Sequence, residues 1–173
     1  MKEFAGKVAG ITGAADGIGK AFALDAAKRG MKLALIDIEG EKLEAVKTEC
    51  EKMGSPKVVA ITVDVSEYEQ VRMSVARMMA EFGQIDLFFS NAGVGGAGTL
   101  VNIPPQDWEW ITSVNFLSMA YYVTEVLPIM VRQGTDAHFM FTISIGGLQP
   151  GMRIQSAYTA SKHAAMSLAE SVK

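Results

Sequence analysis

Short apolar runs alternate with longer amphipathic segments along the chain. Five runs are almost wholly apolar, and this indicates strands that are buried on both faces, as in a parallel sheet covered by helices. They span residues 8–11, 33–36, 58–63, 85–89 and 139–143. Strand, helix and strand repeated in this way predict right-handed crossovers and a doubly wound α/β fold.

The segments between the strands show helical periodicity. The clearest spans residues 67–82, where apolar residues form one stripe that would face a sheet and Ser66 is the expected N-cap. The stripe consists of Val71, Val75, Met78 and Phe82. Glycines follow three predicted helices at the position that favours a left-handed residue. They are Gly30, Gly54 and Gly83.

A long helix is predicted over residues 107–133, with a kink or local break at Pro128 near its end. No linker, low-complexity tract or sequence repeat interrupts the alternation of strands and helices. We therefore expect one domain over residues 1–173, with three α/β/α layers.

Composition narrows the classes of function. The 173 residues are 49% hydrophobic with a net charge of −3, and no run of one sign indicates a nucleic acid or membrane partner. Cys50 excludes an internal disulfide, and together with His138 and His163 it forms no zinc-ligand pattern, so no metal site is expected. The start of the chain resembles neither a signal peptide nor a membrane span, which predicts a cytoplasmic protein.

A glycine-rich segment follows the first predicted strand and precedes a helix. Glycines at 13, 17 and 19 let backbone N–H groups at a helix N-terminus approach a pyrophosphate. A tight turn without a ligand is the alternative, but the position at the start of a βαβ unit favours a dinucleotide and a Rossmann-type sheet. The expected contacts are Gly13, Ala15, Asp16, Gly17, Ile18 and Gly19.

The second strand ends before Asp37, which lies 18 residues after Gly19, where an acidic residue binds the adenosine ribose hydroxyls. A 2′-phosphate would be repelled by Asp37, and neither Asp16 nor Ile38 supplies a compensating cation. The sequence therefore favours NAD as cofactor over NADP. The alternative role for Asp37 is capping of the next helix.

Tyr158 and Lys162 lie four residues apart in a predicted helix and so share one face. A tyrosine with an ordinary pKa of about 10 needs ~4 kcal/mol of stabilisation to ionise near pH 7. A cation ~4 Å away at an effective dielectric of ~20 supplies ~4 kcal/mol. Lys162, helped by a positive nicotinamide ring, would thus make Tyr158 a usable base. An amphipathic helix that carries both residues by accident is the alternative.

Taken together, these features resemble the short-chain dehydrogenase/reductase family across almost the whole chain. The matching positions are the glycine loop, Asp37, Asp64, Val65, Asn91, Ala92, Gly93, Asn115, Ser144, Tyr158 and Lys162. The resemblance implies an NAD(H)-dependent oxidoreductase that interconverts a secondary alcohol and a ketone. A bound-NAD epimerase or dehydratase, and a non-catalytic NAD-binding regulatory protein, are the alternatives.

The resemblance also implies a role for each matching residue. Tyr158 would exchange the alcohol proton, Lys162 would favour its ionisation and bind the nicotinamide ribose, and Ser144 would hold the substrate oxygen. Asn115 would anchor a water that links Lys162 to solvent, or it is simply a satisfied amide inside a helix.

Further positions would contact the cofactor. By resemblance Asp64, followed by Val65, meets the adenine ring, and residues 91–93 let the backbone pass close to the cofactor. Asp64 has a turn or helix cap as its alternative role. Asn91 has as its alternative a hydrogen bond that steadies the sheet, and the two roles of Asn91 are compatible.

The chain departs from the family in three places. Ser90 replaces a common asparagine, Ser144 stands alone where two serines are usual, and the interval from Ser144 to Tyr158 is one residue longer, which widens the loop 148–155. The last residue, Lys173, falls inside the helix of Tyr158, so we expect a fragment of a longer chain whose sheet is incomplete at its C-terminus.

The loops 94–100 and 148–155 are small or apolar, which permits a lipophilic or steroid-like substrate. The candidate substrate contacts are Ser144, Gln149, Met152 and Tyr158. By resemblance, the helices that start at 107 and 156 would pair subunits in a homodimer or homotetramer. Met119, Tyr121 and Tyr122 would line that interface or belong to the core.

Overall fold

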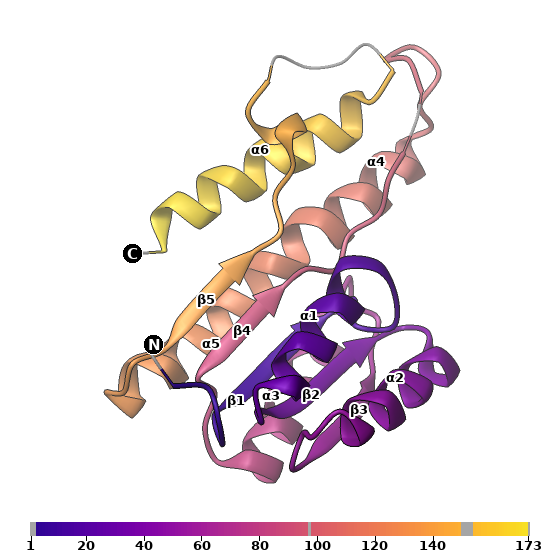
Figure 1. Cartoon of the computed structure of the whole chain (residues 1–173). Coiled ribbons are helices and arrows are strands. Elements are labelled where there is room, and N and C mark those ends of the chain that lie inside the picture. The colour runs from indigo at the N-terminus through magenta and orange to yellow at the C-terminus, as the bar shows by residue number, and fades with distance from the viewer. Residues whose placement is uncertain (1–2, 97, 150–153, 173) are drawn as a thin grey trace.

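The computed structural model describes residues 3–96, 98–149 and 154–172. Its centre is a parallel sheet of five strands in the order β3-β2-β1-β4-β5 (Figure 1). The strands are β1 (Val8–Thr12), β2 (Lys32–Asp37), β3 (Val58–Thr62), β4 (Leu87–Ser90) and β5 (His138–Phe141). All five predicted strands are confirmed, and the order shows the doubly wound topology.

Helices cover both faces of this sheet (Figure 1). They are α1 (Gly17–Lys28), α2 (Gly40–Lys52), α3 (Tyr68–Phe82), α4 (Pro105–Thr112), α5 (Ser118–Gln133) and α6 (Ser156–Ser171). Two short helical turns, η1 (Ser113–Leu117) and η2 (Ile145–Gly147), complete the described elements. Successive strand residues enter opposite cores: Leu33 and Leu35 pack with α1 and α2, while Ala34 and Ile36 pack with α3 and α5. The three-layer α/β/α architecture is therefore confirmed.

The predicted C-terminal glycines and the predicted N-cap of α3 had different outcomes. Gly83 ends the helix with φ 73°, as expected, and Gly30 and Gly54 are likewise left-handed, with φ 71° and 110°. Ser66, however, is not the N-cap, so that prediction was wrong. Its backbone N–H and its hydroxyl both donate to a carboxylate oxygen of Asp64, at 2.9 and 2.7 Å, because a tight turn precedes the helix.

The long predicted helix begins at Pro105 and reaches Gln133. Its irregularity lies at η1, a π-helical segment, and not at Pro128, where α5 continues, so the predicted break was wrong. By length and composition alone, the segment 105–133 could cross a membrane, since an 18-residue window within it has a mean hydropathy of 1.4. It packs instead against the sheet, where Met119 and Tyr122 are fully buried. These two residues thus belong to the core.

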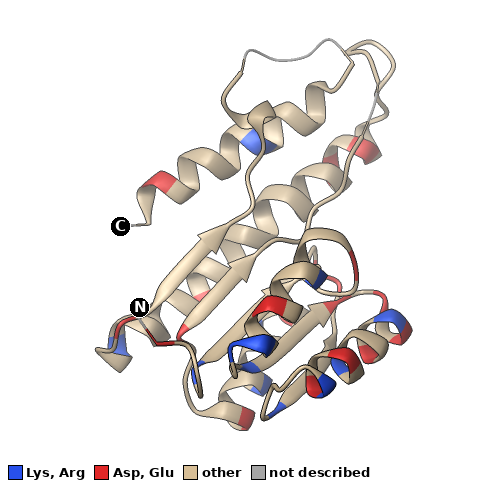
Figure 2. Cartoon of the chain, viewed as in Figure 1, with Lys and Arg blue, Asp and Glu red and all other residues tan. Residues whose placement is uncertain are grey.

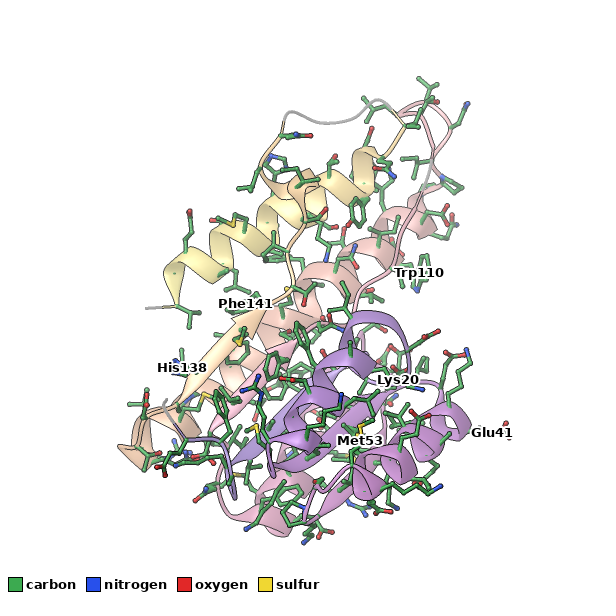
Figure 3. All side chains as sticks on the ribbon, in the orientation of Figure 1. Lys20, Glu41, Met53, Trp110, His138 and Phe141 are labelled. Atoms are coloured by element: carbon green, nitrogen blue, oxygen red, sulfur yellow. The ribbon has the colours of Figure 1, made fainter. Side chains whose placement is uncertain are left out.

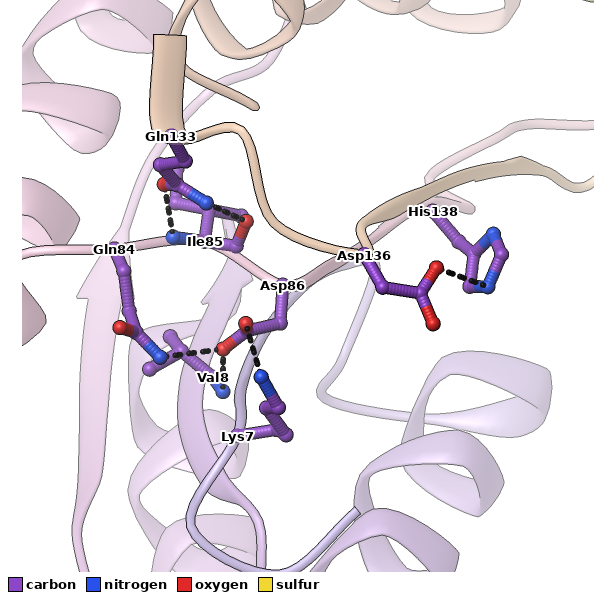
Figure 4. A network of polar contacts seen from close by, with 8 residues as sticks. All are labelled: Lys7, Val8, Gln84, Ile85, Asp86, Gln133, Asp136 and His138. Carbon is purple, nitrogen blue, oxygen red and sulfur yellow. Dashed lines mark hydrogen bonds and ion pairs between the residues drawn. The ribbon is translucent and has the colours of Figure 1, made fainter. Parts of the chain in front are cut away.

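A polar network fastens the amino ends of the strands (Figure 4). The buried carboxylate of Asp86 accepts hydrogen bonds from the backbone of Val8 at 2.8 Å, from Gln84 at 2.7 Å and from Lys7 at 3.2 Å. Nearby, the side-chain amide of Gln133 bonds to both backbone groups of Ile85. These bonds fix the start of β4 beside β1 at the amino end of the sheet, opposite the carboxyl ends of the strands.

Candidate active site

A cavity of about 890 Å³ opens at the carboxyl ends of β1, β4 and β5. It lies between β1 and β4, where the winding of the sheet reverses, and parallel sheets bind ligands at this place. It is lined by Gly13, Asp16, Gly17, Ile18, Asp37, Asn91, Ala92, Gly93, Val94, Gly95, Thr142, Ile143, Ser144, Ile145, Gln155, Tyr158 and Lys162. The fold thus brings together the predicted glycine loop and the predicted catalytic helix.

The glycine loop packs so closely that two of its positions require glycine. A Cβ at Gly13, where φ is +66°, would lie 3.0 Å from Asn91 and Ala92 atoms, and a Cβ at Gly19 would lie 2.0 Å from the carbonyl oxygen of Gly13. A bare backbone therefore faces the cavity at the N-terminus of α1, which is the environment that a pyrophosphate needs. The residues present fit a dinucleotide.

Acidic residues flank this loop. Asp16 caps α1 by accepting a hydrogen bond from the N–H of Gly17 at 2.7 Å. Asp37 lies at the end of β2, where its two carboxylate oxygens accept from the N–H groups of Ala15 at 2.9 Å and of Glu39 at 3.0 Å. Asp37 thus lines the cavity and steadies the turn before α2, but it is not the N-cap of that helix, which is Glu39.

Some predicted cofactor residues lie away from the cavity lining. Ile38 is 62% exposed, and Val65 is buried in the core. Asp64 forms the turn with Ser66 that was its alternative role, and the backbone N–H of Asp64 is bound by Gln70 at 3.0 Å. None of the three is among the residues that line the cavity, nor is the buried Ala15.

Asn91 joins the three strand ends. Its amide nitrogen donates to the carbonyl oxygen of Thr12 at 3.0 Å, and its amide oxygen accepts from the hydroxyl of Thr142 at 2.9 Å. Its backbone N–H and that of Ala92 donate to the Thr12 hydroxyl at 2.9 and 3.0 Å. The sheet-steadying hydrogen bond that was the alternative role is therefore present.

Asn115 is fully buried in η1, and its side chain is satisfied by the protein. The amide oxygen accepts from the N–H of Val94 at 2.7 Å, while the amide nitrogen donates to the Val94 carbonyl at 2.9 Å and to the Ser161 hydroxyl at 3.1 Å. A Cβ on Gly93 would lie 3.2 Å from the Asn115 oxygen and 3.4 Å from the Lys162 amine, so both groups border the same narrow space.

Tyr158 and Lys162 share one face of α6, as their spacing predicted. The Lys162 amine lies 5.9 Å from the centre of the Tyr158 ring, and it donates to the Thr142 carbonyl at 3.2 Å. Lys162 is only 4% exposed, and its burial lowers the pKa of the ammonium below the ordinary value. A partly desolvated cation therefore stands beside the phenol.

Ser144 approaches this pair from β5. Its hydroxyl accepts from the N–H of Gly146 at 3.1 Å, and a Cβ on Gly146 would lie 3.4 Å from both the Ser144 hydroxyl and the Tyr158 ring. Gln149 is exposed and outside the cavity lining, and Met152 lies outside the described residues. Ser144, Tyr158 and Lys162 therefore converge on one wall.

The sequence analysis missed three polar residues around the site. Thr12 and Thr142 bond to Asn91, and Ser161 links Asn115 to the carbonyl oxygen of Tyr158 at 2.7 Å. Thr12 and Thr142 share one signal that could have found them, since each is a hydroxyl residue at the carboxyl end of a predicted strand. Their neighbours, however, come from distant segments and appear only in the folded chain.

The Rossmann-type sheet, the glycine cradle and the nearby tyrosine and lysine define a dinucleotide-binding protein. The family model of the short chain dehydrogenases matches residues 7–173. The chain belongs to this family, as its sequence motifs predicted.

Individual relatives and solved structures support membership of this family. The chain is 40% identical over 98% of its length to a CLA biosynthesis dehydrogenase/reductase of Lactiplantibacillus plantarum, and it covers 59% of that protein. It is also 40% identical to a short chain dehydrogenase/reductase of Burkholderia phymatum solved with NAD, with a TM-score of 0.94 over 99% of this chain and 60% of that one. A metagenomic short-chain oxidoreductase solved with NADP is 30% identical, with a TM-score of 0.91 over 97% of this chain and 75% of that one.

The buried ammonium generates a prediction about stability. Because the native state lowers the pKa of Lys162, the unfolded chain binds more protons between that lowered value and about 10.5, and stability rises with pH across this window. Replacement by an apolar side chain removes the cost of burial. Without cofactor at pH 7, Lys162→Met should raise the free energy of unfolding by roughly 0.5–2 kcal/mol, and this gain should shrink as the pH approaches 10.

Urea unfolding at several pH values measures this difference. Lys28→Met, at an exposed position of α1, is the matched control and should change stability by less than about 0.5 kcal/mol. A Lys162→Met protein that is less stable than the parent at pH 7 would contradict the prediction.

Proposed function

We propose that the protein containing this chain is an NAD-dependent oxidoreductase that interconverts a secondary alcohol and a ketone. The observation that carries the proposal is one cavity lined by the glycine cradle at one end and by Ser144, Tyr158 and Lys162 at the other. Nucleotide and substrate would thus meet in a single site. The family relationship supports the class of reaction.

In this mechanism the bound nicotinamide ring supplies the hydride chemistry. The hydroxyls of Ser144 and Tyr158 hold the substrate oxygen between them. During oxidation the Tyr158 oxygen removes the alcohol proton, and during reduction it returns that proton to the ketone. The ammonium of Lys162 favours the ionised phenol by charge attraction, which is strong because little water reaches it.

Asn115 has a supporting role in the proposal. Its two amide groups fix the backbone of Val94 and the hydroxyl of Ser161, which is itself bonded to the Tyr158 carbonyl. The narrow space between Asn115, Gly93 and Lys162 is where a water would pass protons from the amine to solvent. The same hydrogen bonds keep α6 in register with the loop after β4.

The phenol of Tyr158 carries the test of this function. Tyr158→Phe removes the proton-transfer group and keeps the ring, so kcat should fall about 10²- to 10⁴-fold while the Kd for NADH stays within about threefold. A panel of secondary alcohols, scored by NADH formation, measures the first quantity, and NADH fluorescence measures the second. Tyr121→Phe, outside the cavity lining, is the control.

Two results would contradict the proposed function. Full activity of the Tyr158→Phe variant would remove the tyrosine from the chemistry. Turnover of a substrate without net formation of NADH would favour an epimerase or dehydratase that retains its cofactor, and NADH binding without any turnover would favour a regulatory protein.

We further propose that NAD is preferred over NADP. Asp37 places its carboxylate at the edge of the cavity beside Ala15, and Asp16 adds a second negative charge in the same region. A 2′-phosphate with a charge near −2 would be repelled there, and the nearby ammonium of Lys42 is already paired with Glu39 at 2.8 Å. The acidic corner therefore favours a cofactor with free ribose hydroxyls.

Removal of this charge should relax the preference. The parent enzyme should favour NAD in kcat/KM by at least about tenfold, and Asp37→Ser should reduce the ratio at least about tenfold, because a serine keeps an acceptor for the Ala15 N–H without the charge. Glu51→Gln, near the C-terminal end of α2, exposed and outside the cavity lining, is the control and should change the ratio little. Faster turnover of the parent with NADPH than with NADH would contradict the preference.

The apolar surroundings of the cavity support a lipophilic alcohol or ketone, including a steroid-like one, as substrate. Val94 and Ile145 line the cavity, and Ile145 is 62% exposed at its edge. Leu148 and Ile154 are exposed by 63 and 61% in the neighbouring loop. Gln149 and Met152 remain predicted contacts. A cytoplasmic location also remains a prediction.

We propose a homodimer or homotetramer built on α4, α5 and α6. Charged residues gather on the other half of the molecule (Figure 2): α2 has seven among 13 residues, whereas α5 and α6 have two each among 16. Trp110, 51% exposed, points away from α4 (Figure 3). Light scattering of the purified protein should give two or four times the mass of one chain, and a monomer at micromolar concentration would contradict this.

A further inference from the structure

Thr142 forms hydrogen bonds with both Asn91 and Lys162. It follows β5, lines the cavity and is half-buried. Its backbone N–H extends the sheet by donating to the Ser90 carbonyl at 3.0 Å. Its hydroxyl donates to the amide oxygen of Asn91 at 2.9 Å, and its carbonyl oxygen accepts from the amine of Lys162 at 3.2 Å.

Hydrogen bonds also fix which way the Asn91 amide faces. The carbonyl oxygens of Thr12 and Gly13 can only accept, so they take the amide nitrogen of Asn91. The amide oxygen is thereby left to the Thr142 hydroxyl, which donates to it. An unbroken series of hydrogen bonds therefore runs from the glycine loop through Asn91 and Thr142 to the amine of Lys162.

Lys162 depends on such a support. A lysine side chain is flexible, with four rotatable bonds, and the amine of Lys162 has the Thr142 carbonyl as its one hydrogen-bond acceptor within the described chain. The titratable groups that line the same cavity are Tyr158 on its own helix and Asp16 and Asp37 at the glycine loop. The distance from the Lys162 amine to the Tyr158 phenol therefore depends on the position of the end of β5.

We propose that Thr142 is a positioning residue that ties the ammonium of Lys162 to the glycine loop through Asn91, and thereby sets its distance from the reacting phenol. This inference rests on the proposed function. Charge attraction falls with distance, so a shift from ~4 to ~6 Å at an effective dielectric of ~20 changes ionisation of the phenol about tenfold, or about one pH unit.

Thr142→Val keeps the shape of the side chain and removes the hydroxyl, whereas Thr142→Ser keeps the hydroxyl. Thr48→Val, at an exposed position of α2 where the hydroxyl bonds only to the Glu44 carbonyl, is the matched control. All three are made in the intact protein and checked by circular dichroism. If Thr142→Val fails to fold, Thr142→Ala takes its place.

The first measurement needs no activity. Lysine side chains labelled with ¹³C are titrated by NMR without cofactor, and the Lys162 signal is assigned from its loss in Lys162→Met. In Thr142→Val a loosened and better hydrated amine should titrate at least about 0.5 pH unit closer to an ordinary lysine. The signal should return to the parent value in Thr142→Ser and stay there in Thr48→Val.

The second measurement is the pH profile of kcat for alcohol oxidation. Its acidic limb should move about 0.5–1 pH unit upward in Thr142→Val and remain in place in Thr142→Ser. An unchanged titration of Lys162 together with an unchanged profile, even with a lower Tm, would overturn the proposal and leave Thr142 a structural residue. An inactive parent protein would overturn the proposed function alone, because the NMR titration still judges Thr142.

Discussion

The hydrogen bonds of Asn91 are the interaction on which the geometry of the site depends. A single side chain joins the carboxyl ends of β1 and β5 from its place after β4, and its backbone is held by the hydroxyl of Thr12. Parallel strands have no tight turns between them to fix their relative positions at this edge. A half-buried amide that satisfies donors and acceptors on both neighbours supplies that connection at the floor of the cavity.

The two ends of the sheet are fastened in different ways. At the amino end the charged carboxylate of Asp86 accepts hydrogen bonds from three donors, whereas the cavity of the candidate site lies at the opposite end. At the carboxyl end neutral amides and hydroxyls make the connections, which leaves Lys162 as the buried charge. No buried carboxylate within the described residues pairs with this ammonium, so under the proposed function its charge would act on the phenol of Tyr158.

Local stability and chemistry oppose each other in α6. Small residues let the helix pack tightly, for a Cβ on Gly147 would lie 2.6 Å from the Lys162 carbonyl. The same packing strips water from the Lys162 amine, which destabilises its charged form. The fold tolerates this cost because the surrounding layers are well packed, and under the proposed function the desolvated cation would favour the ionised form of Tyr158.

The sequence by itself determined the five strands, the layer order and the main motifs, because these follow from hydrophobic periodicity and from residue types at fixed local spacings. Tyr158 and Lys162 are one helical turn apart, and the glycines 13, 17 and 19 lie within one loop, so their relations needed no tertiary information. Sequence patterns failed where more than one local structure fitted the same residues. Ser66 bonds to Asp64 instead of capping α3, and the irregular turn of the long helix falls at Asn115 instead of Pro128.

Only the tertiary structure decided which distant polar groups meet. Asn91 lies 79 residues from Thr12 and 51 residues from Thr142 along the chain, and Ser161 meets Asn115 across 46 residues. Their hydrogen bonds depend on strand order and on the depth at which each helix packs, and neither is encoded in a local pattern. The residues that we propose for the chemistry were therefore visible in the sequence, whereas the residues that bond to them across the fold became visible only once the chain was folded.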